Sequence, residues 1–220
     1  KAFATSTAPS APSLTITNQS QPEGNAGTST MTFTVNLSAI SGRDVSFSRD
    51  TLDGTATVAN NDYVALAAQT LTIPAGTTQL TIPVTINGDT TFEGNESFSV
   101  SLTGVSNATP ASISGTGTLE EDDQQPTTTT ITADTPDPTV VGQPYTVSAT
   151  VVAQTTSPLG TVTISDGSAS CNATLLAGAA PNSAMSCLLT STSAGTKTLT
   201  ASYTPASSAF AASNDTDTHQ

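Results

Sequence analysis

The stretch Asn87-Gly-Asp-Thr-Thr-Phe-Glu-Gly-Asn-Glu-Ser-Phe-Ser-Val100 decides both the fold and the candidate site of this chain. Its first part is rich in Gly and Asn, which favour turns, and it carries the carboxylates of Asp89, Glu93 and Glu96. From residue 97 onward serine alternates with apolar side chains, and this two-residue period predicts a β-strand with one buried face. Three carboxylates within eight residues repel one another unless a cation lies among them. Calcium prefers oxygen ligands in a loop, so we predict that this turn binds Ca2+.

A second acidic cluster, Glu120-Glu-Asp-Asp123, closes the same half of the chain. Both clusters flank segments with strand periodicity, and alternate strand ends of a β-sandwich meet at one end of the sandwich. We therefore predict that the two clusters meet there and share calcium, which would relieve the repulsion between their carboxylates.

The composition is that of a chain poor in charge, in which Thr, Ser and Ala dominate. With 220 residues it can form one large domain or two ordinary ones. Only 10% of the residues are charged, so a disordered Ser/Thr-rich stalk has to be considered. Regular alternation of Val, Ile and Leu favours folded β structure instead, because Thr is branched at Cβ and suits the outer face of a strand.

The net charge of −13 restricts the partners of the chain. Four basic residues are too few to neutralise a phosphate backbone, so we expect no nucleic-acid partner and no anionic membrane surface without a divalent bridge. No apolar run approaches the roughly 18 residues of a membrane span. The basic residues are Lys1, Arg43, Arg49 and Lys197.

Residues 13–123 contain short alternating segments, such as 31–37 and 80–86, separated by turn signals at intervals of roughly ten residues. This spacing is typical of a β-sandwich. Residues 1–12 are small, polar and punctuated by proline, and we predict a tail or linker there. Because the chain begins at Lys1 rather than Met, we expect it to be a processed piece of a longer protein.

Five spaced motifs follow one another in this half: Pro22-Glu-Gly24, Asp53-Gly-Thr-Ala56, Asp62-Tyr63, the block from Gly88 to Phe98, and Asp122-Asp123. Their order resembles that of the Calx-beta domain, the module of sodium–calcium exchangers that recurs in bacterial surface proteins. Residues 13–123 therefore resemble a Calx-beta domain, which implies an immunoglobulin-like sandwich with calcium at one end.

The resemblance also implies a set of calcium ligands, drawn from two turns, the acidic loop and the closing acidic residues. The corresponding positions are Glu23, Asp53, Asp89, Glu93, Glu96, Glu121, Asp122 and Asp123, with the backbone carbonyl of Thr91. Exchanger modules carry paired aspartates where this chain has Gly88-Asp89, and Glu121 replaces a usual aspartate. We therefore expect one or two ions rather than a full cluster. Asp62 is assigned to its own turn, with Tyr63 packed inward.

Gln124-Gln-Pro126 and the threonines that follow mark a domain boundary, and we predict a linker at residues 124–128. The alternation then restarts, which predicts a second, smaller sandwich at residues 129–215. Its stretches 160–167 and 194–203 resemble the bacterial immunoglobulin-like (Big-type) repeats of cell-surface proteins. Residues 216–220 are predicted to be a frayed tail. The predicted fold is thus all-β, with two tandem immunoglobulin-like antiparallel β-sandwiches.

The only cysteines, Cys171 and Cys187, are too far apart in sequence for a redox motif and suit an oxidising compartment. We predict that they form a disulfide, which would contribute about 3 kcal/mol through chain entropy. Two free, inert thiols are the alternative, because neither cysteine has a basic neighbour that would activate it.

No catalytic function is predicted. The only histidine, His219, lies in the predicted tail, so a Ser-His-Asp arrangement cannot be built. Glu93 and Glu96 could mimic a carboxylate pair, but the chain lacks the aromatic residues that frame a glycosidase cleft.

We predict a calcium-binding structural and adhesive segment of a larger secreted or cell-surface protein, bacterial in origin. Calcium would rigidify the first sandwich and the linker, and the segment would be monomeric, with an unidentified protein or glycan partner. One alternative is a module that binds carbohydrate or protein through its loops, although the shortage of Trp and Tyr argues against a sugar platform. Another is an accessory domain of an exported enzyme, which only the parent protein would distinguish from an adhesin.

Overall fold

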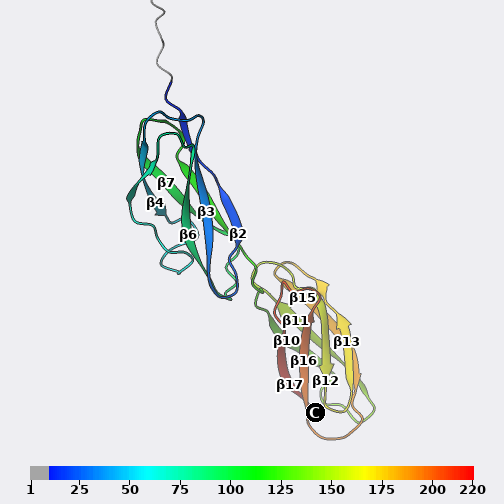
Figure 1. The fold of residues 1–220 in the computed structure, drawn as a ribbon. Helices are drawn as coiled ribbons and strands as arrows, with labels where there is room; N and C mark the ends of the chain where they lie inside the picture. The colour runs from blue at the N-terminus through cyan, green and yellow to red at the C-terminus, as the bar shows by residue number, and fades with distance from the viewer. Residues whose placement is uncertain (1–9) are drawn as a thin grey trace, which may run out of the picture. The chain divides into compact units, whose positions relative to one another are not determined.

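A computed structural model of the protein describes residues 10–220, and these residues form an all-β fold, as predicted (Figure 1). The chain divides into two compact units, and it passes from one to the other between Asp123 and Gln124. Most of the predicted tail at residues 1–12 lies outside the described residues, and the first strand begins at Ser13. Within the described range no helix is present that could cross a membrane.

The first unit consists of two sheets. One sheet has the strand order β6-β3-β1-β8, and the other has the order β2-β9-β7-β4-β5. The strands are β1 (Ser13–Ile16), β2 (Gln19–Pro22), β3 (Gly27–Leu37), β4 (Val45–Leu52), β5 (Gln69–Ile73), β6 (Gln79–Gly88), β7 (Glu96–Ser106), β8 (Thr109–Ser112) and β9 (Ser114–Glu120).

Alternation in the sequence builds the core of this unit, because every second side chain of a strand points to the same face. Phe33 of β3 and Phe98 of β7 come from opposite sheets, and their rings meet edge to face with centroids 6.0 Å apart. Tyr63, from the long loop between β4 and β5, stacks on Phe98 at 4.3 Å. The inward packing predicted for Tyr63 is confirmed, and the two sheets enclose one apolar core.

Two strand pairs depart from the antiparallel pattern that the sequence predicts. β1 pairs with β8, and β2 pairs with β9, both in parallel. The chain changes sheet twice, between β1 and β2 and between β8 and β9, so that each parallel pair lies in a different sheet. The parallel β2–β9 pair brings the end of β2 beside Glu120, whose carbonyl accepts a hydrogen bond from the Glu23 backbone N–H at 3.1 Å.

The second unit is also a two-sheet sandwich, with strand orders β10-β11-β15-β14 and β13-β12-β16-β17. Its core is built from alternate residues of β11, β12, β15 and β16. The strands are β10 (Thr128–Thr135), β11 (Pro144–Val152), β12 (Gly160–Ser165), β13 (Ser170–Thr174), β14 (Leu176–Ala177), β15 (Asn182–Thr190), β16 (Lys197–Pro205) and β17 (Ser213–His219).

The disulfide between Cys171 and Cys187 is confirmed. Cys171 lies on β13 and Cys187 on β15, and these strands belong to different sheets of the second unit. The half-buried bond therefore ties the two layers of the sandwich together beside the core.

The prediction of a frayed tail at residues 216–220 is wrong. Residues 213–219 form β17, which pairs along its length with β16, and His219 lies opposite Lys197. Asp and Thr alternate in this segment, so its sequence has no apolar periodicity that would indicate a strand. An edge strand can form without apolar side chains, because its pairing depends on backbone hydrogen bonds. His219 is only 1% exposed.

The predicted linker at residues 124–128 is largely part of the second unit. Gln125 is buried, its backbone N–H donates to Ala209 O at 3.0 Å, and its carbonyl accepts from Ala211 N at 2.9 Å. The Gln125 side-chain amide donates to Thr155 Oγ1 at 2.7 Å and its oxygen accepts backbone N–H bonds from residues 154 and 155. The polar atoms of the buried Gln125 side chain are therefore all hydrogen-bonded, although the composition of this segment predicted an exposed linker.

Candidate metal centre

Four connecting segments of the first unit converge at one end of the sandwich: the β2–β3 turn, the β4–β5 loop, the β6–β7 loop and the residues that follow β9. The strand registers place them there, because the paired residues at this end are Pro22 and Glu120, Gly27 and Gly88, Leu52 and Ser99, and Glu96 and Leu119. All eight predicted acidic ligands lie on these segments or, in the case of Glu96, at the start of β7. We call this end the acidic pole.

Three carboxylates of the acidic pole lie closest together. Oxygens of Asp62, Glu93 and Glu96 all lie within 4.8 Å of one another. A calcium ion bound at 2.3–2.6 Å from each of three oxygens holds them at separations up to roughly 5 Å. The donor set is therefore of the right type and spacing for a calcium ion.

Asp62 was not among the predicted ligands. The prediction that it bonds its own turn is confirmed, since its Oδ2 accepts a hydrogen bond from Thr57 N at 2.5 Å. Its carboxylate is nevertheless 4% exposed and lies beside Glu96. The long β4–β5 loop folds over the start of β7 because Tyr63, the next residue, stacks on Phe98. The sequence predicted that Tyr63 packs inward, but it did not indicate that this packing brings the carboxylate of Asp62 to Glu96.

The pKa values of three glutamates at the acidic pole are raised by burial and by the neighbouring carboxylates. Burial raises the pKa of Glu23 to about 7, and the negative charges of Asp89 and Glu93 add to the effect. Burial also raises the pKa of Glu96 to about 7, with further contributions from a hydrogen bond to Asp62 and from its charge. The pKa of Glu93 is raised by burial and then by Asp62. Glu23 and Glu96 are therefore partly protonated near neutral pH unless a cation is bound.

Glu121 holds the acidic loop in place. Its Oε2 accepts hydrogen bonds from the backbone N–H groups of Glu93 and Gly94, both at 2.6 Å, and its Oε1 accepts from Asp123 N at 2.7 Å. The Asn95 side-chain oxygen in turn accepts a bond from the Glu121 N–H at 3.0 Å. The extra methylene of Glu relative to Asp gives this carboxylate its reach, so Glu121 positions the loop that carries Glu93.

The remaining predicted ligands lie at the rim of the pole and organise its turns. Asp122 Oδ1 accepts a bond from Gly24 N at 3.1 Å, and Asp123 Oδ1 accepts from Asn25 Nδ2 at 2.5 Å. Asp89 Oδ1 accepts from Thr91 N at 2.6 Å, closing a local Asx turn. Each of these carboxylates keeps its second oxygen outside these bonds.

Asp53 is held on the neighbouring turn by the buried tyrosine. Tyr63 donates its hydroxyl to Asp53 Oδ1 at 2.6 Å, and the Val58 backbone N–H donates to the same oxygen at 3.2 Å. The Asp53-Gly-Thr-Ala56 turn lies against the start of β7, because Ala56 N donates to Ser97 O at 3.0 Å. The structure thus places Asp53 next to the Glu96 segment and fixes one of its oxygens.

Gly88, where the exchanger pattern has a carboxylate, is required by close packing. A β-carbon added at Gly88 would lie 2.0 Å from the carbonyl oxygen of Gly24. No side chain fits there without separating the two turns. The departure from the exchanger pattern therefore has a steric cause.

The acidic pole has no basic partner among the described residues. In residues 10–220 the contacts between a basic side chain and a carboxylate within 4.0 Å all involve His219, in the other unit. Arg49 directs its guanidinium to Ala67 O and to Gln69 Oε1, both at 2.7 Å. The carboxylates of the pole are thus left to protons or to a cation from solution.

A sequence profile of the Calx-beta domain matches residues 12–134, more than half of the chain. The chain belongs to the Calx-beta family. Calx-beta domains are non-catalytic calcium-binding modules, similar to those of the sodium–calcium exchanger. The profile ends at residue 134, so the likeness of the second unit to bacterial Big-type repeats stays a prediction.

Solved structures that are similar to this chain include three of Calx domains. The apo-form Calx CBD1 domain is 21% identical, with a TM-score of 0.45, and the match covers 52% of this chain and 100% of that one. CBD12 from CALX1.2 is 17% identical, with a TM-score of 0.46 and coverage of 86% and 79%. The calcium binding domain CBD12 of CALX1.1 is 18% identical, with a TM-score of 0.46 and coverage of 87% and 79%. No curated protein matches the sequence.

Proposed function

We propose that the chain is a calcium-binding structural segment of a larger secreted or cell-surface protein, with an adhesive role. The observation that carries this proposal is the convergence of Asp62, Glu93 and Glu96, whose carboxylate oxygens lie within 4.8 Å of one another at an end without a basic partner among the described residues. The disulfide of the second unit supports an oxidising, extracytoplasmic location, since such bonds persist there.

Calcium would act by replacing the protons of the acidic pole. At neutral pH Glu23 and Glu96, each with a pKa of about 7, would be only partly ionised in the metal-free protein, and a bound cation would complete their ionisation. The ion would bridge the β4–β5 loop, which carries Asp62, to the β6–β7 loop, which carries Glu93. Binding to the folded state alone stabilises that state by mass action.

The position of the site also favours control of the linker. Glu121 bonds both the acidic loop and the Asp123 N–H, and Gln125 is anchored in the second unit. Only Gln124 lies between Asp123 and that anchor. Calcium bound at the pole would fix residues 121–123 and so restrict rotation about the short connection.

Thermal unfolding in EDTA, with calcium and then magnesium restored separately, tests the calcium proposal. Calcium should raise the midpoint of the first unit in a concentration-dependent way, while magnesium, which demands stricter octahedral geometry, should have a much smaller effect. Glu96→Gln should remove the response. Asp44→Asn is the matched control. Asp44 is an exposed residue that immediately precedes β4, whereas the acidic pole lies at the other end of this strand, after Leu52. A midpoint that stays constant up to millimolar calcium contradicts the proposal.

Backbone 15N relaxation tests the linker. Calcium should slow the fast motions of the residue 121–124 amides, and Glu96→Gln should leave them mobile. If calcium raises the midpoint without changing these amides, the ion stabilises the domain only and the linker part of the proposal is rejected.

A further inference from the structure

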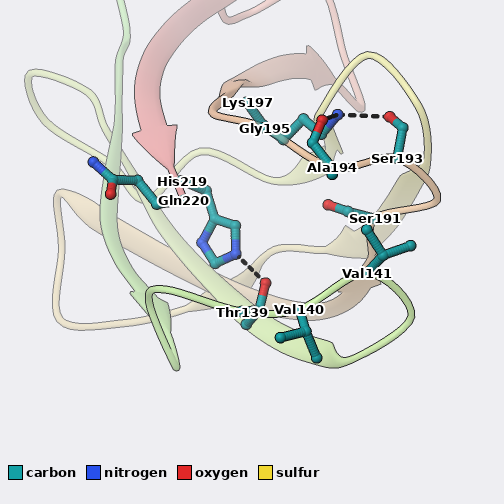
Figure 2. A pocket seen from close by; sticks show the side chains of 10 residues that line it. All are labelled: Thr139, Val140, Val141, Ser191, Ser193, Ala194, Gly195, Lys197, His219 and Gln220. Atoms are coloured by element: carbon teal, nitrogen blue, oxygen red, sulfur yellow. Dashed lines mark hydrogen bonds between the residues drawn. The ribbon is translucent and has the colours of Figure 1, made fainter.

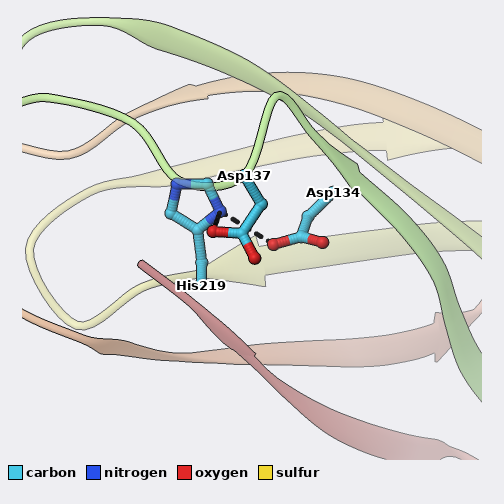
Figure 3. Close-up of side chains that lie close together, drawn as sticks. All are labelled: Asp134, Asp137 and His219. Atoms are coloured by element: carbon cyan, nitrogen blue, oxygen red, sulfur yellow. Dashed lines mark hydrogen bonds and ion pairs between the residues drawn. The ribbon is translucent and has the colours of Figure 1, made fainter.

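A second group of potential metal ligands lies in the second unit, on segments far apart in the sequence. Asp134 is near the end of β10, Asp137 is in the loop that follows, and His219 ends β17. Their ligand atoms lie within 4.8 Å of one another (Figure 3). His219 Nδ1 is 2.7 Å from Asp134 Oδ2 and 3.5 Å from Asp137 Oδ1.

The imidazole is held in one orientation by its surroundings. It is 1% exposed and stacks on the ring of Tyr145, with centroids 3.8 Å apart and planes 8° from parallel. Its other nitrogen, Nε2, is 2.7 Å from Thr139 Oγ1 (Figure 2). The ring therefore presents Nδ1 to the two carboxylates and Nε2 to a hydroxyl that can accept a hydrogen bond from the Nε2–H group.

Asp137 is held by the backbone of the same strand end. Gln220 N donates to Asp137 Oδ1 at 2.8 Å, and Thr139 N donates to Gln220 O at 2.6 Å. Pro136 and Pro138 flank Asp137 and fix the φ angles on either side of it. The carboxylate is thus placed over the edge of the ring while its side chain stays 35% exposed, which leaves a path from solvent.

We infer that Asp134, Asp137 and His219 form a binding site for a divalent transition metal of the zinc class. An imidazole nitrogen and carboxylate oxygens are both ligands that zinc takes, and three protein ligands leave the fourth tetrahedral position open for water. Two donors at 2.0–2.2 Å from a tetrahedral ion lie roughly 3.3 Å apart. The distance from Nδ1 to Asp137 Oδ1, 3.5 Å, is close to this value. Asp134 Oδ2, at 2.7 Å from Nδ1, must move outward by roughly half an ångström to admit the metal.

The environment of the ring matches what a metal-ligating histidine requires. Such a histidine donates its second N–H to a fixed acceptor, which sets the tautomer and the ring orientation. Thr139 Oγ1 is placed to accept that bond. Lys197, which pairs in register with His219, directs its ammonium to Ser193 Oγ at 2.6 Å rather than to the carboxylates, so it does not occupy the site (Figure 2).

The nitrogen ligand separates this site from the acidic pole, where the donors are carboxylate oxygens. Imidazole favours zinc, nickel and copper, whereas calcium and magnesium favour sites made of oxygen alone. The inference therefore does not rest on the proposed calcium function. His219 is the only histidine of the chain and both cysteines are in the disulfide, so an imidazole-bound metal can lie only here.

The test uses the full, tag-free chain, since a polyhistidine tag would itself bind zinc. Zinc is added in the presence of saturating calcium, which occupies the acidic pole, and the ring nitrogens of His219 are followed by 1H–15N NMR. Coordination should move the Nδ1 resonance to the position of a metal-bound nitrogen while Nε2 stays protonated. An unchanged His219 spectrum at millimolar zinc overturns the inference.

Amino-acid substitutions test whether zinc binds at the three proposed ligands rather than at other carboxylates. Asp137→Asn should weaken zinc binding measured by calorimetry at least about tenfold, the loss expected for a disturbed metal shell. Asp217→Asn is the matched control, because Asp217 is an exposed carboxylate on the same strand, outside the three-residue group. Binding that is equal in both variants is adventitious and rejects the site. Because His219→Gln can impair folding, Asp137→Asn at the exposed rim is the deciding variant.

Discussion

Replacing Glu23 by glutamine should stabilise the metal-free first unit at alkaline pH, although it removes a native side chain. Glu23 is 8% exposed, and its carboxylate lies among other acidic groups at the pole. Burial and the charges of Asp89 and Glu93 raise its pKa from 4.5 to about 7. The ionised carboxylate is therefore less stable in the folded state than in the unfolded chain.

The size of the effect follows from the two pKa values. Raising the pKa from 4.5 to about 7 corresponds to roughly 3 kcal/mol against the ionised folded state. Glutamine removes the charge but keeps a polar group at the same place, so we expect a net gain of about 1–3 kcal/mol at roughly pH 8.

The sign depends on pH. Below about pH 4.5 the carboxyl is protonated in both states, so wild type and variant should have similar stabilities. Between about pH 4.5 and 7 the folded state retains a proton that the unfolded state has lost, so wild-type stability falls as the pH rises. Above about pH 7 the full difference between variant and wild type is present.

Calcium should reverse the order of stability. The wild type gains binding free energy from the ion, whereas Glu23→Gln loses a negative charge at the pole and gains less. The variant should then be more stable than the wild type in EDTA and less stable in saturating calcium.

Urea unfolding of the full chain, followed by 1H–15N correlation spectra, measures this because residues of each unit report their own transition. The second unit serves as an internal control, and Asp44→Asn should leave both transitions unchanged. A variant that is less stable than wild type in EDTA at roughly pH 8 refutes the reasoning, since it would mean that Glu23 stabilises the fold as an ordinary ionised group.

Further substitutions test the packing that supports the two units. Gly88→Ala should destabilise the first unit by several kcal/mol and weaken calcium binding, because its β-carbon would meet a backbone carbonyl at 2.0 Å; thermal melts with and without calcium measure both effects. Tyr63→Phe should cost about 1–2 kcal/mol in urea unfolding, since the bond to Asp53 is lost while the ring stack remains. Replacing Cys171 and Cys187 together by alanine should lower the stability of the second unit by about 2–4 kcal/mol and leave the first unit unchanged, as read from their separate NMR transitions.

Local pattern was sufficient for the fold class and for the disulfide. The two-residue alternation around Phe98 defines a strand wherever it occurs, because successive side chains of an extended chain point to opposite faces. The acidic turn before that strand was likewise visible, because a concentration of carboxylates is a property of adjacent residues. The two cysteines had no other partners from which to choose.

Features that depend on distant segments were not predictable from pattern. The parallel β2–β9 pair arises from a change of sheet, and no residue type signals it. Asp62 reaches Glu96 only because Tyr63 stacks on Phe98 and draws the long loop over β7.

Strand β17 is a further feature that local pattern could not predict. Its alternating Asp and Thr residues have no apolar period, so local propensity indicates a tail. The structure nevertheless pairs them with β16 and buries His219 against Tyr145, beside carboxylates about 80 residues away. The backbone hydrogen bonds between β16 and β17 do not depend on side-chain type, and the contacts of His219 with the carboxylates join residues that are distant in sequence. Periodicity reports burial along one segment, so it determined the sandwiches, and only tertiary packing decided which charged groups face one another.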